Sequence, residues 1–330
     1  MKESTRFGTV TTTTYSAAAP LYSFTDLGTL GGALSIAHGI NNAGQVVGAS
    51  QNADGEWRAT LWDGTTPTAL GVLGWDSSTA HDINDAGKIV GSSVVESHGC
   101  YRAAAWNGTT PTDLGWGDAQ GINTNGLVAG FSSLARNSQR YATAWIGTIP
   151  TYLDNLGRGA TAWTEHYAID INDTGQVVGR ACAAYPSMTA TVWIGGIPTD
   201  IGSSFERSGT SAVNNAGQVV GWGIFDGRDR AILWNGINPT ILEPLGGFDK
   251  KQCANDINDD GLIVGWGKAA TLEFHALIWN GITPTDLNKL VHSNAAGWTL
   301  NLANAINRAG QIVGSATNSS GQYHAYLLTP

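Results

Sequence analysis

Seven residues of this 330-residue chain stand two positions before a repeated Ile-Asn or Val-Asn pair, and two of them are histidines. With the repeats aligned, the row reads His38, His81, Gln120, Ile169, Ser211, Asn255 and Asn304. Imidazoles in neighbouring repeats could share a metal ion, or one could act as a general base near neutral pH. Metal sites usually need three or four protein ligands, and this spacing fixes no third one. We therefore expect no metal and no other cofactor. The alternative to a catalytic role for this row is a polar lining whose side chains bind backbone groups and water.

Two segments rich in aromatic and charged residues lengthen the spacing between repeats, at 156–170 and 290–305. The first carries Arg158, Trp163, Glu165, His166 and Tyr167, and the second carries His292 and Trp298. Aromatic faces beside charged groups are typical of a ligand cleft, and we expect these segments to frame one. The alternative is that both tryptophans pack against neighbouring repeats, because a loop Trp is often buried.

Basic residues are concentrated in the variable segments of the middle repeats, among acidic neighbours. They are Arg136, Arg140, Arg158, Arg207, Arg228, Lys250 and Lys251. Planar guanidinium groups bind carboxylates, so one interpretation is an anionic ligand such as a uronate-rich glycan. The other interpretation is an ordinary solvated face.

These candidate residues belong to one short unit that the chain repeats. Variants of INNAGQVVG start at residues 40, 83, 122, 171, 213, 257 and 306, and a spacing in the forties indicates a repeat architecture. Asn at the first and Gly at the fourth position favour a tight turn between two strands. A strand ending in Trp and a Pro-Thr segment follow in most copies. The Trp residues (Trp62, Trp106, Trp145, Trp193, Trp234 and Trp279) lie in apolar strands, so we expect them in the core.

Four short strands in about 45 residues match one blade of a β-propeller. The last repeat stops at YHAYLLTP (323–330), where the others continue into a fourth strand, and SFTDLGTLGG (23–32) supplies such a strand at the other end. The sequence therefore predicts an all-β chain. We expect residues 22–330 to form a seven-bladed propeller of four-stranded antiparallel blades, closed by the N-terminal strand, with residues 1–21 outside the ring.

The combination of INxxGQVVG, FHALIW (274–279) or YHAYLL (323–328), and DLGTLGG (26–32) resembles the HAF-repeat family of probable extracellular bacterial proteins. The resemblance covers residues 23–330, although Arg replaces the family's His in WRATLW, YRAAAW and DRAILW. It implies a repeat fold and an extracellular or periplasmic location. It assigns no catalytic residues.

Composition restricts the partners. The net charge is −9 and only 13% of residues are charged, which argues against nucleic acid, because a basic face supplies most of that affinity. No apolar run is long enough to span a membrane, and SAAAP near the N-terminus lacks the apolar segment of a signal peptide. Cys100, Cys182 and Cys253 are odd in number and fall in different repeats, so we expect no disulfide framework. We expect a monomer.

Three hypotheses for the function follow. In the first, the chain is a secreted or surface module that binds carbohydrate or another small or anionic ligand at one central site on the variable-loop face. Its ligand-binding residues would be Arg158, Trp163, Tyr167, His292, Trp298, Gln120, Asn255 and Asn304. In the second, it is a lyase or hydrolase, with His38, His81 or His166 as the base and Glu165 as the acid partner. In the third, it is a protein-interaction ring.

Overall fold

The computed structural model describes residues 21–74, 77–96, 100–135, 138–157, 166–184, 187–246, 251–269 and 273–330. Strands dominate the described part, and two single-turn 3-10 helices, η1 (Leu287–Lys289) and η2 (Ser293–Ala295), lie between strands near the C-terminus. None of the helices in these ranges has the length and apolar character needed to cross a membrane. The prediction of an all-β chain is confirmed.

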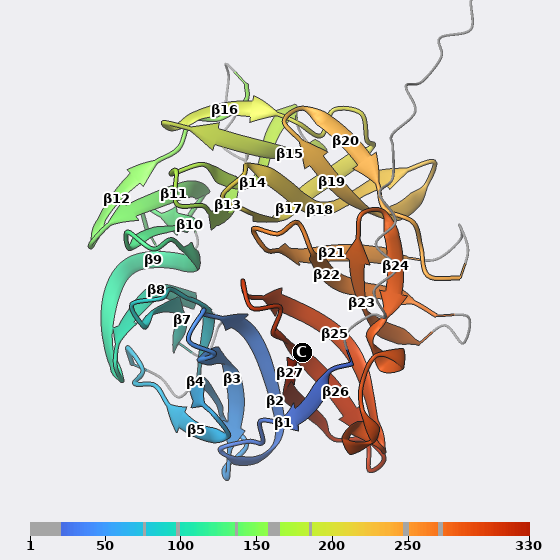
Figure 1. Cartoon of the computed structure of the whole chain (residues 1–330). Helices are drawn as coiled ribbons and strands as arrows, with labels where there is room; N and C mark the ends of the chain where they lie inside the picture. Colours follow the sequence, from blue (N-terminus) through green and yellow to red (C-terminus); the bar gives the residue numbers. More distant parts are fainter. Residues whose placement is uncertain are drawn as a thin grey trace, which may run out of the picture.

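Most strands belong to four-stranded antiparallel sheets, which stand around a common axis (Figure 1). One sheet contains β2 (Gly31–Ile40), β3 (Val46–Asn52), β4 (Trp57–Asp63) and β5 (Thr66–Ala69). A second contains β13 (Tyr167–Ile171), β14 (Val177–Ala184), β15 (Ser187–Ile194) and β16 (Ile197–Asp200). A third contains β17 (Arg207–Val213), β18 (Gln218–Phe225), β19 (Arg228–Asn235) and β20 (Asn238–Ile241). A fourth contains β21 (Gln252–Ile257), β22 (Ile263–Lys268), β23 (Phe274–Asn280) and β24 (Thr283–Asp286).

One sheet has seven strands instead of four. It contains β6 (Ser78–Ile83), β7 (Lys88–Glu96), β8 (Cys100–Asn107), β9 (Thr110–Ile122), β10 (Leu127–Ser133), β11 (Arg140–Ile146) and β12 (Ile149–Tyr152). The long strand β9 pairs with β8 as far as Trp116 and with β10 from Gly117 onward. Here the strand that ends one repeat continues directly into the strand that begins the next.

The first strand of the chain joins the last repeat. β1 (Ser23–Asp26) pairs with β27 (Tyr323–Thr329), which is followed in the sheet by β26 (Ile312–Asn318) and β25 (Trp298–Ile306). Tyr22 extends this contact by bridging Val291 and is only 2% exposed. In Figure 1 the blue β1 and β2 therefore lie beside the red C-terminal strands.

The core lies between neighbouring sheets. One cluster joins Val47 and Leu70 of one repeat to Ile89 and Trp106 of the next, and similar clusters recur around the axis. All six repeated tryptophans are 0% exposed, as the sequence predicts. Truncating a buried Trp costs about 3–5 kcal/mol, so these side chains hold neighbouring repeats together.

Candidate functional site

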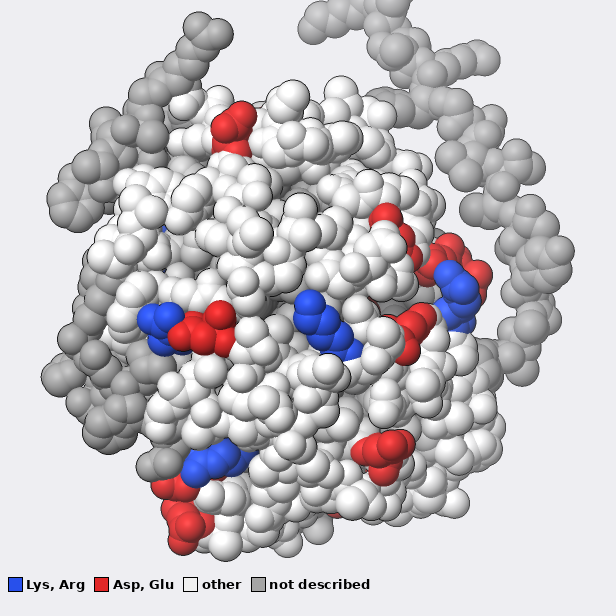
Figure 2. Space-filling view, turned by 90° about the vertical axis from the view of Figure 1, so that its left-hand side faces the viewer, with Lys and Arg blue, Asp and Glu red and all other residues white. Residues whose placement is uncertain are grey.

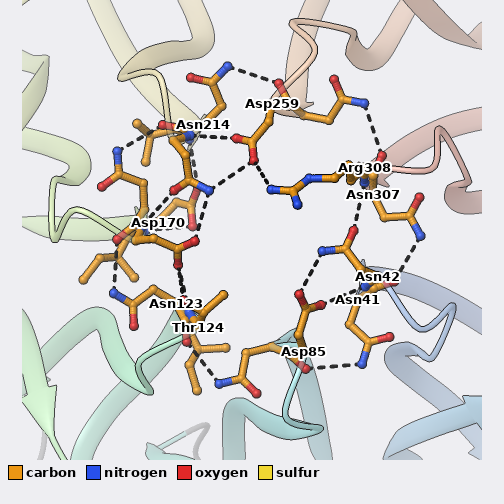
Figure 3. Close-up of a pocket in the computed structure, with 18 of the residues that line it drawn as sticks. Asn41, Asn42, Asp85, Asn123, Thr124, Asp170, Asn214, Asp259, Asn307 and Arg308 are labelled. Carbon is orange, nitrogen blue, oxygen red and sulfur yellow. Dashed lines mark hydrogen bonds and ion pairs between the residues drawn. The ribbon is translucent and has the colours of Figure 1, made fainter.

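The first Asn of each turn joins its repeat to the next. The Asn41 side-chain oxygen accepts from the N–H groups of Ala43 and Gln45 (3.1 and 2.9 Å), and its Nδ2 donates to the Asn84 carbonyl (3.2 Å). The same inter-repeat bond is made by Asn41, Asn84, Asn123, Asn172, Asn214, Asn258 and Asn307 (Figure 3). Asn307 completes the series by donating to the Asn41 carbonyl at 3.0 Å.

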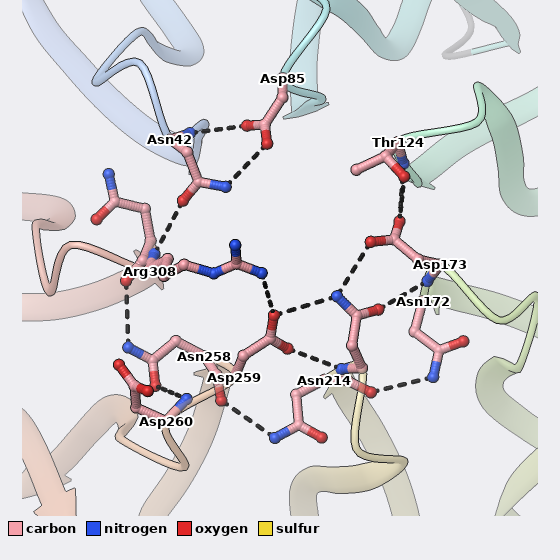
Figure 4. A network of polar contacts seen from close by, with 12 residues as sticks. Asn42, Asp85, Thr124, Asn172, Asp173, Asn214, Asn258, Asp259, Asp260 and Arg308 are labelled. Atoms are coloured by element: carbon pink, nitrogen blue, oxygen red, sulfur yellow. Dashed lines mark hydrogen bonds and ion pairs between the residues drawn. The ribbon is translucent and has the colours of Figure 1, made fainter.

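The second residue of each turn forms a polar rim around a shallow cavity of about 210 Å³ (Figure 4). Asn215 donates from Nδ2 to Asp173 and Asp259 (3.0 and 3.2 Å), and Arg308 donates to Asp259 at 2.9 Å. Burial alone would raise the pKa of Asp259, but the bonds from Asn215 and Arg308 lower it. Because these groups bind one another, the rim holds the turns together.

Deeper along the axis, the row that begins at His38 points into a second cavity. Ala37 lies opposite Gly48 and Gly39 lies opposite Val47, which leaves His38 unpaired in a β-bulge. The same shift of register occurs at the corresponding residue of the other repeats. All seven residues of the row line one cavity of about 500 Å³, which we call the cup: His38, His81, Gln120, Ile169, Ser211, Asn255 and Asn304.

The bulge explains the final Gly of the repeated motif. A Cβ built at Gly48 would overlap the Ile36 carbonyl oxygen, and one built at Gly91 would overlap the Thr79 carbonyl oxygen. The corresponding glycines of the other repeats meet a carbonyl in the same way. A residue with a side chain at this position would force the bulge open and move the cup residue.

Three carboxylates line the floor of the cup. Asp82, Asp170 and Asp256 each accept two backbone N–H groups, one from their own repeat and one from the next, at 2.7–2.8 Å. Burial raises the pKa of all three, and burial together with the charge of Asp170 brings those of Asp82 and Asp256 to about 7. Among the described residues, no group of His, Cys, Asp or Glu is arranged to hold a metal ion.

The two histidines of the row lie together on one side of the cup. Their ring centroids are 5.7 Å apart, and His81 Nε2 lies 3.1 Å from Asp118 Oδ1. Burial lowers the pKa of His81, but Asp118 outweighs burial and raises it above the usual value. Burial, followed by the charge of His81, lowers the pKa of His38 to about 3. The two neighbouring imidazoles thus have pKa values shifted in opposite directions, and His81 is the one that holds a proton more readily.

The amides of the row satisfy backbone carbonyls of the next repeat. Asn255 donates to the Ala303 carbonyl at 2.9 Å, and Asn304 donates to the Ala37 carbonyl at 2.8 Å. Both side chains thus perform the structural role that the sequence left open as an alternative. Trp266 also lines the cup and gives it an aromatic wall.

His292 and Trp298 line a different cavity, of about 500 Å³, beside Glu273, His275 and Asn288. Trp298 is partly buried, with its ring 5.4 Å from Phe24. The structure therefore separates these two predicted residues from the cup.

The other predicted cleft segment is described only from residue 166 onward. His166 and Tyr167 are buried, and the Tyr167 hydroxyl accepts from Arg140 at 3.0 Å. The Arg180 guanidinium lies 4.8 Å from the centre of the same ring. Arg158, Trp163 and Glu165 lie outside the described residues, so a cleft shared with 290–305 stays a prediction.

The motif histidines hold an edge strand in place. His275 Nδ1 lies 2.8 Å from Asp286 on the outermost strand, and His324 Nδ1 lies 3.0 Å from Asp26 on β1. In one of the three repeats where Arg replaces His, Arg102 binds Asp113 at 2.6 Å in the same way, whereas Arg58 binds Glu56 instead. The Asp in each of these pairs belongs to the DLG-type segment, so the pairs fasten the edge strand to its sheet.

Sequence reasoning missed Asp82, Asp118, Asp170, Asp256 and Trp266. The three floor carboxylates had a readable signal, since the residue directly before the repeated Ile or Val alternates between Asp and a small residue: Gly39, Asp82, Gly121, Asp170, Ala212, Asp256 and Ala305. No sequence signal pointed to Asp118 or Trp266, because the repeats do not show which side chains of these strands face the axis.

The outer surface carries few charges. Figure 2 shows one side of the molecule, where Lys and Arg are scattered and mostly near Asp or Glu. Elsewhere on the molecule Lys251 likewise binds an acidic residue, Asp229, at 2.9 Å. The described surface in this view has no basic patch of the kind that binds nucleic acid.

No protein-family model matches the sequence, and no curated protein is similar to it. Among solved structures, TolB from Acinetobacter baumannii is similar at 10% identity and a TM-score of 0.44, with 86% of this chain and 63% of TolB covered. The BP39L lectin from Burkholderia pseudomallei is similar at 12% identity and a TM-score of 0.35, over 92% and 97% of the two chains. The extracellular domain of the two-component system BT3049 from B. thetaiotaomicron is similar at 10% identity and a TM-score of 0.44, with 94% of this chain and 41% of that chain covered. Similarity at this level identifies neither a ligand nor an activity.

Proposed function

We propose that the chain is a secreted or surface ligand-binding protein, a seven-bladed propeller closed by its N-terminal strand, that binds carbohydrate in the cup. Seven blades are supported by the division of β9, whose two halves pair with different repeats. Closure is supported by the pairing of β1 with β27 and by the bond from Asn307 to Asn41. An extracellular or periplasmic location rests on the family resemblance.

The observation that carries this proposal is the lining of the cup. Bulge residues from six of the seven repeats supply amides, imidazoles and a hydroxyl, the seventh is Ile169, and Trp266 supplies an aromatic face. A cavity of about 500 Å³ with an apolar wall and a few convergent polar groups fits a small molecule. Hydroxyl groups of a sugar can both donate to and accept from such a lining, while its C–H face packs on indole.

The charge of the cup favours a neutral sugar over an acidic one. Asp82, Asp170 and Asp256 face the cavity, and none of its described lining residues is Lys or Arg. A carboxylate on the ligand would add a negative charge beside these three carboxyl groups, and Coulomb repulsion would weaken its binding. The anionic glycan considered from the sequence would therefore have to bind elsewhere, at the variable loops.

A panel of neutral and anionic sugars, assayed by calorimetry and for new products, tests the proposal. Trp266→Ala should weaken binding of a retained neutral sugar at least about tenfold, or about 1.4 kcal/mol. Trp222→Ala is the matched control, because Trp222 holds the equivalent place in the neighbouring repeat and does not line the cup. Equal losses in both variants, or binding of acidic sugars only, would refute the assignment to the cup.

A second candidate is an enzyme whose active centre uses the His81–Asp118 pair. The 3.1 Å separation of Nε2 and Oδ1 is the observation that favours it, since a carboxylate-paired imidazolium can serve as a general acid. New products in the panel, lost in His81→Gln and kept in His292→Gln, would establish a lyase or hydrolase. Retention of sugar without products would exclude it for the sugars tested.

A further inference from the structure

The repeated Ile or Val of each turn motif presents its backbone N–H to the axis. Asn41 N donates to the Gln45 carbonyl at 3.0 Å, so the next pair, Ile40 with Val46, does not exchange hydrogen bonds. The Ile40 N–H therefore points away from β3. The same geometry holds at Ile83, whose N–H turns to the Asp82 carboxylate instead of the partner strand.

The three floor carboxylates accept hydrogen bonds from six of these seven N–H groups. Each bridges the Ile or Val of its own repeat and of the next, and the six donors are Ile83, Ile122, Ile171, Val213, Ile257 and Ile306. Because each of the three carboxylates accepts from two repeats, together they bind the N–H groups of six repeats and not that of the seventh. The N–H of Ile40 is left over, and no side chain among the described residues accepts it.

The position beside this N–H is open to the cup. Its neighbours on the floor are Gly39 and Ala305, which carry no carboxylate, and both line the cavity. A Cβ built at Gly39 would lie 3.3 Å from Asp82 Oδ1, so the Asp82 carboxylate stands next to the gap. Because the Ile40 N–H opens to the cup and binds no side chain of the described residues, it is available to donate to a ligand oxygen.

We propose that the Ile40 N–H anchors a hydroxyl of the ligand, which accepts from Ile40 and donates to the Asp82 carboxylate. The proposal rests on the proposed function and names its ligand class, a neutral polyhydroxylated sugar. A ligand carboxylate could accept from Ile40 but would face three carboxylates. An apolar group would leave the N–H without a partner.

Spectra of the amide and indole N–H groups, from protein labelled with ¹⁵N-isoleucine and ¹⁵N-tryptophan, test the anchor directly. Ile40→Val removes one cross-peak and assigns it, and Val213 shows that Val is accepted at this position. In the free protein the Ile40 amide should exchange with solvent at least about tenfold faster than that of Ile83. Glucose should shift the Ile40 cross-peak and slow its exchange, whereas glucuronate should do neither.

Two outcomes separate the anchor from the proposed function. If glucose or another neutral sugar shifts the Trp266 indole but leaves the Ile40 amide unchanged, the anchor is wrong and the cup remains the site. If no sugar shifts either signal, both proposals fall. An Ile40 amide as slow to exchange as Ile83 in the free protein would also overturn the anchor.

A substitution that fills the gap gives an independent test. Ala305→Asp places a carboxylate where it can accept from Ile40, and we expect glucose affinity to fall at least about tenfold. Ala212→Asp is the matched control, since it adds the same charge where both N–H groups already bind Asp170 and Asp256. An equal loss in both variants would show that charge, not the gap, is responsible.

Discussion

Neutralising one floor carboxylate should change how stability depends on pH. Asp256 accepts the N–H groups of Ile257 and Ile306 at 2.8 Å, and burial raises its pKa from 3.8 to about 7, with Asp170 adding to the rise. A raised pKa in the folded state means that the proton favours folding. The contribution is complete below pH 3.8 and is lost as the pH rises through about 7.

The size of the effect follows from the shift. One pKa unit corresponds to about 1.36 kcal/mol, so a rise from 3.8 to about 7 sets an upper bound of about 4 kcal/mol. Water in the cup screens the charge, since Asp256 is only partly buried, and we expect about 1–2 kcal/mol. Asp256→Asn removes the titration while keeping one acceptor oxygen.

Urea unfolding followed by Trp fluorescence at pH 4.5 and pH 8 measures the effect. The free energy of unfolding of the unsubstituted protein, minus that of Asp256→Asn, should fall by about 1–2 kcal/mol between the two pH values. Taking this difference cancels most of the opposing titration of His38. Asp63→Asn, at an exposed turn, is the control and should give no such change. A constant or rising difference for Asp256→Asn would refute the reasoning.

Three further predictions concern the scaffold. Asn172→Ala removes the bond to the next repeat (3.0 Å) and the acceptor of two turn N–H groups, and should cost about 2–4 kcal/mol in urea unfolding; a loss below 0.5 kcal/mol would contradict the role of the Asn series. Gly179→Ala places a Cβ against the carbonyl across the bulge and should cost more than about 3 kcal/mol, so stability close to that of the unsubstituted protein would disprove the steric argument. His324→Ala releases Asp26 and should speed hydrogen exchange in β1 selectively, a result that uniform exchange across all sheets would contradict.

Much of the architecture could be predicted because it depends on contacts that recur in every repeat. The Asn and Gly of each turn close it within five residues of chain, and the Trp residues lie in apolar strands, so both roles can be predicted from the sequence. The bond from each Asn to the next repeat could not be predicted in this way. The cup row from His38 to Asn304 was also found by alignment alone, because every repeat places its bulge at the same position.

The predicted pairing of 156–170 with 290–305 depends on the path of long segments, which no repeat constrains. The structure places His292 and Trp298 in a cavity of their own, beside Glu273 and His275. The aromatic residue that does line the cup, Trp266, comes from the second strand of a repeat, where the sequence analysis named no candidate residue.

The sequence by itself determined the repeat, its turn chemistry, the buried tryptophans and the row of residues at one level, because these follow from local periodicity. Only the tertiary structure decided what that row faces. The shifted pKa values of His38 and His81, the raised pKa of Asp82 and the Ile40 N–H that binds no side chain all arise between repeats, from groups about 40 residues apart in the chain. The physical reason is that burial and Coulomb interactions depend on distance in space, which the spacing of residues along a strand does not fix.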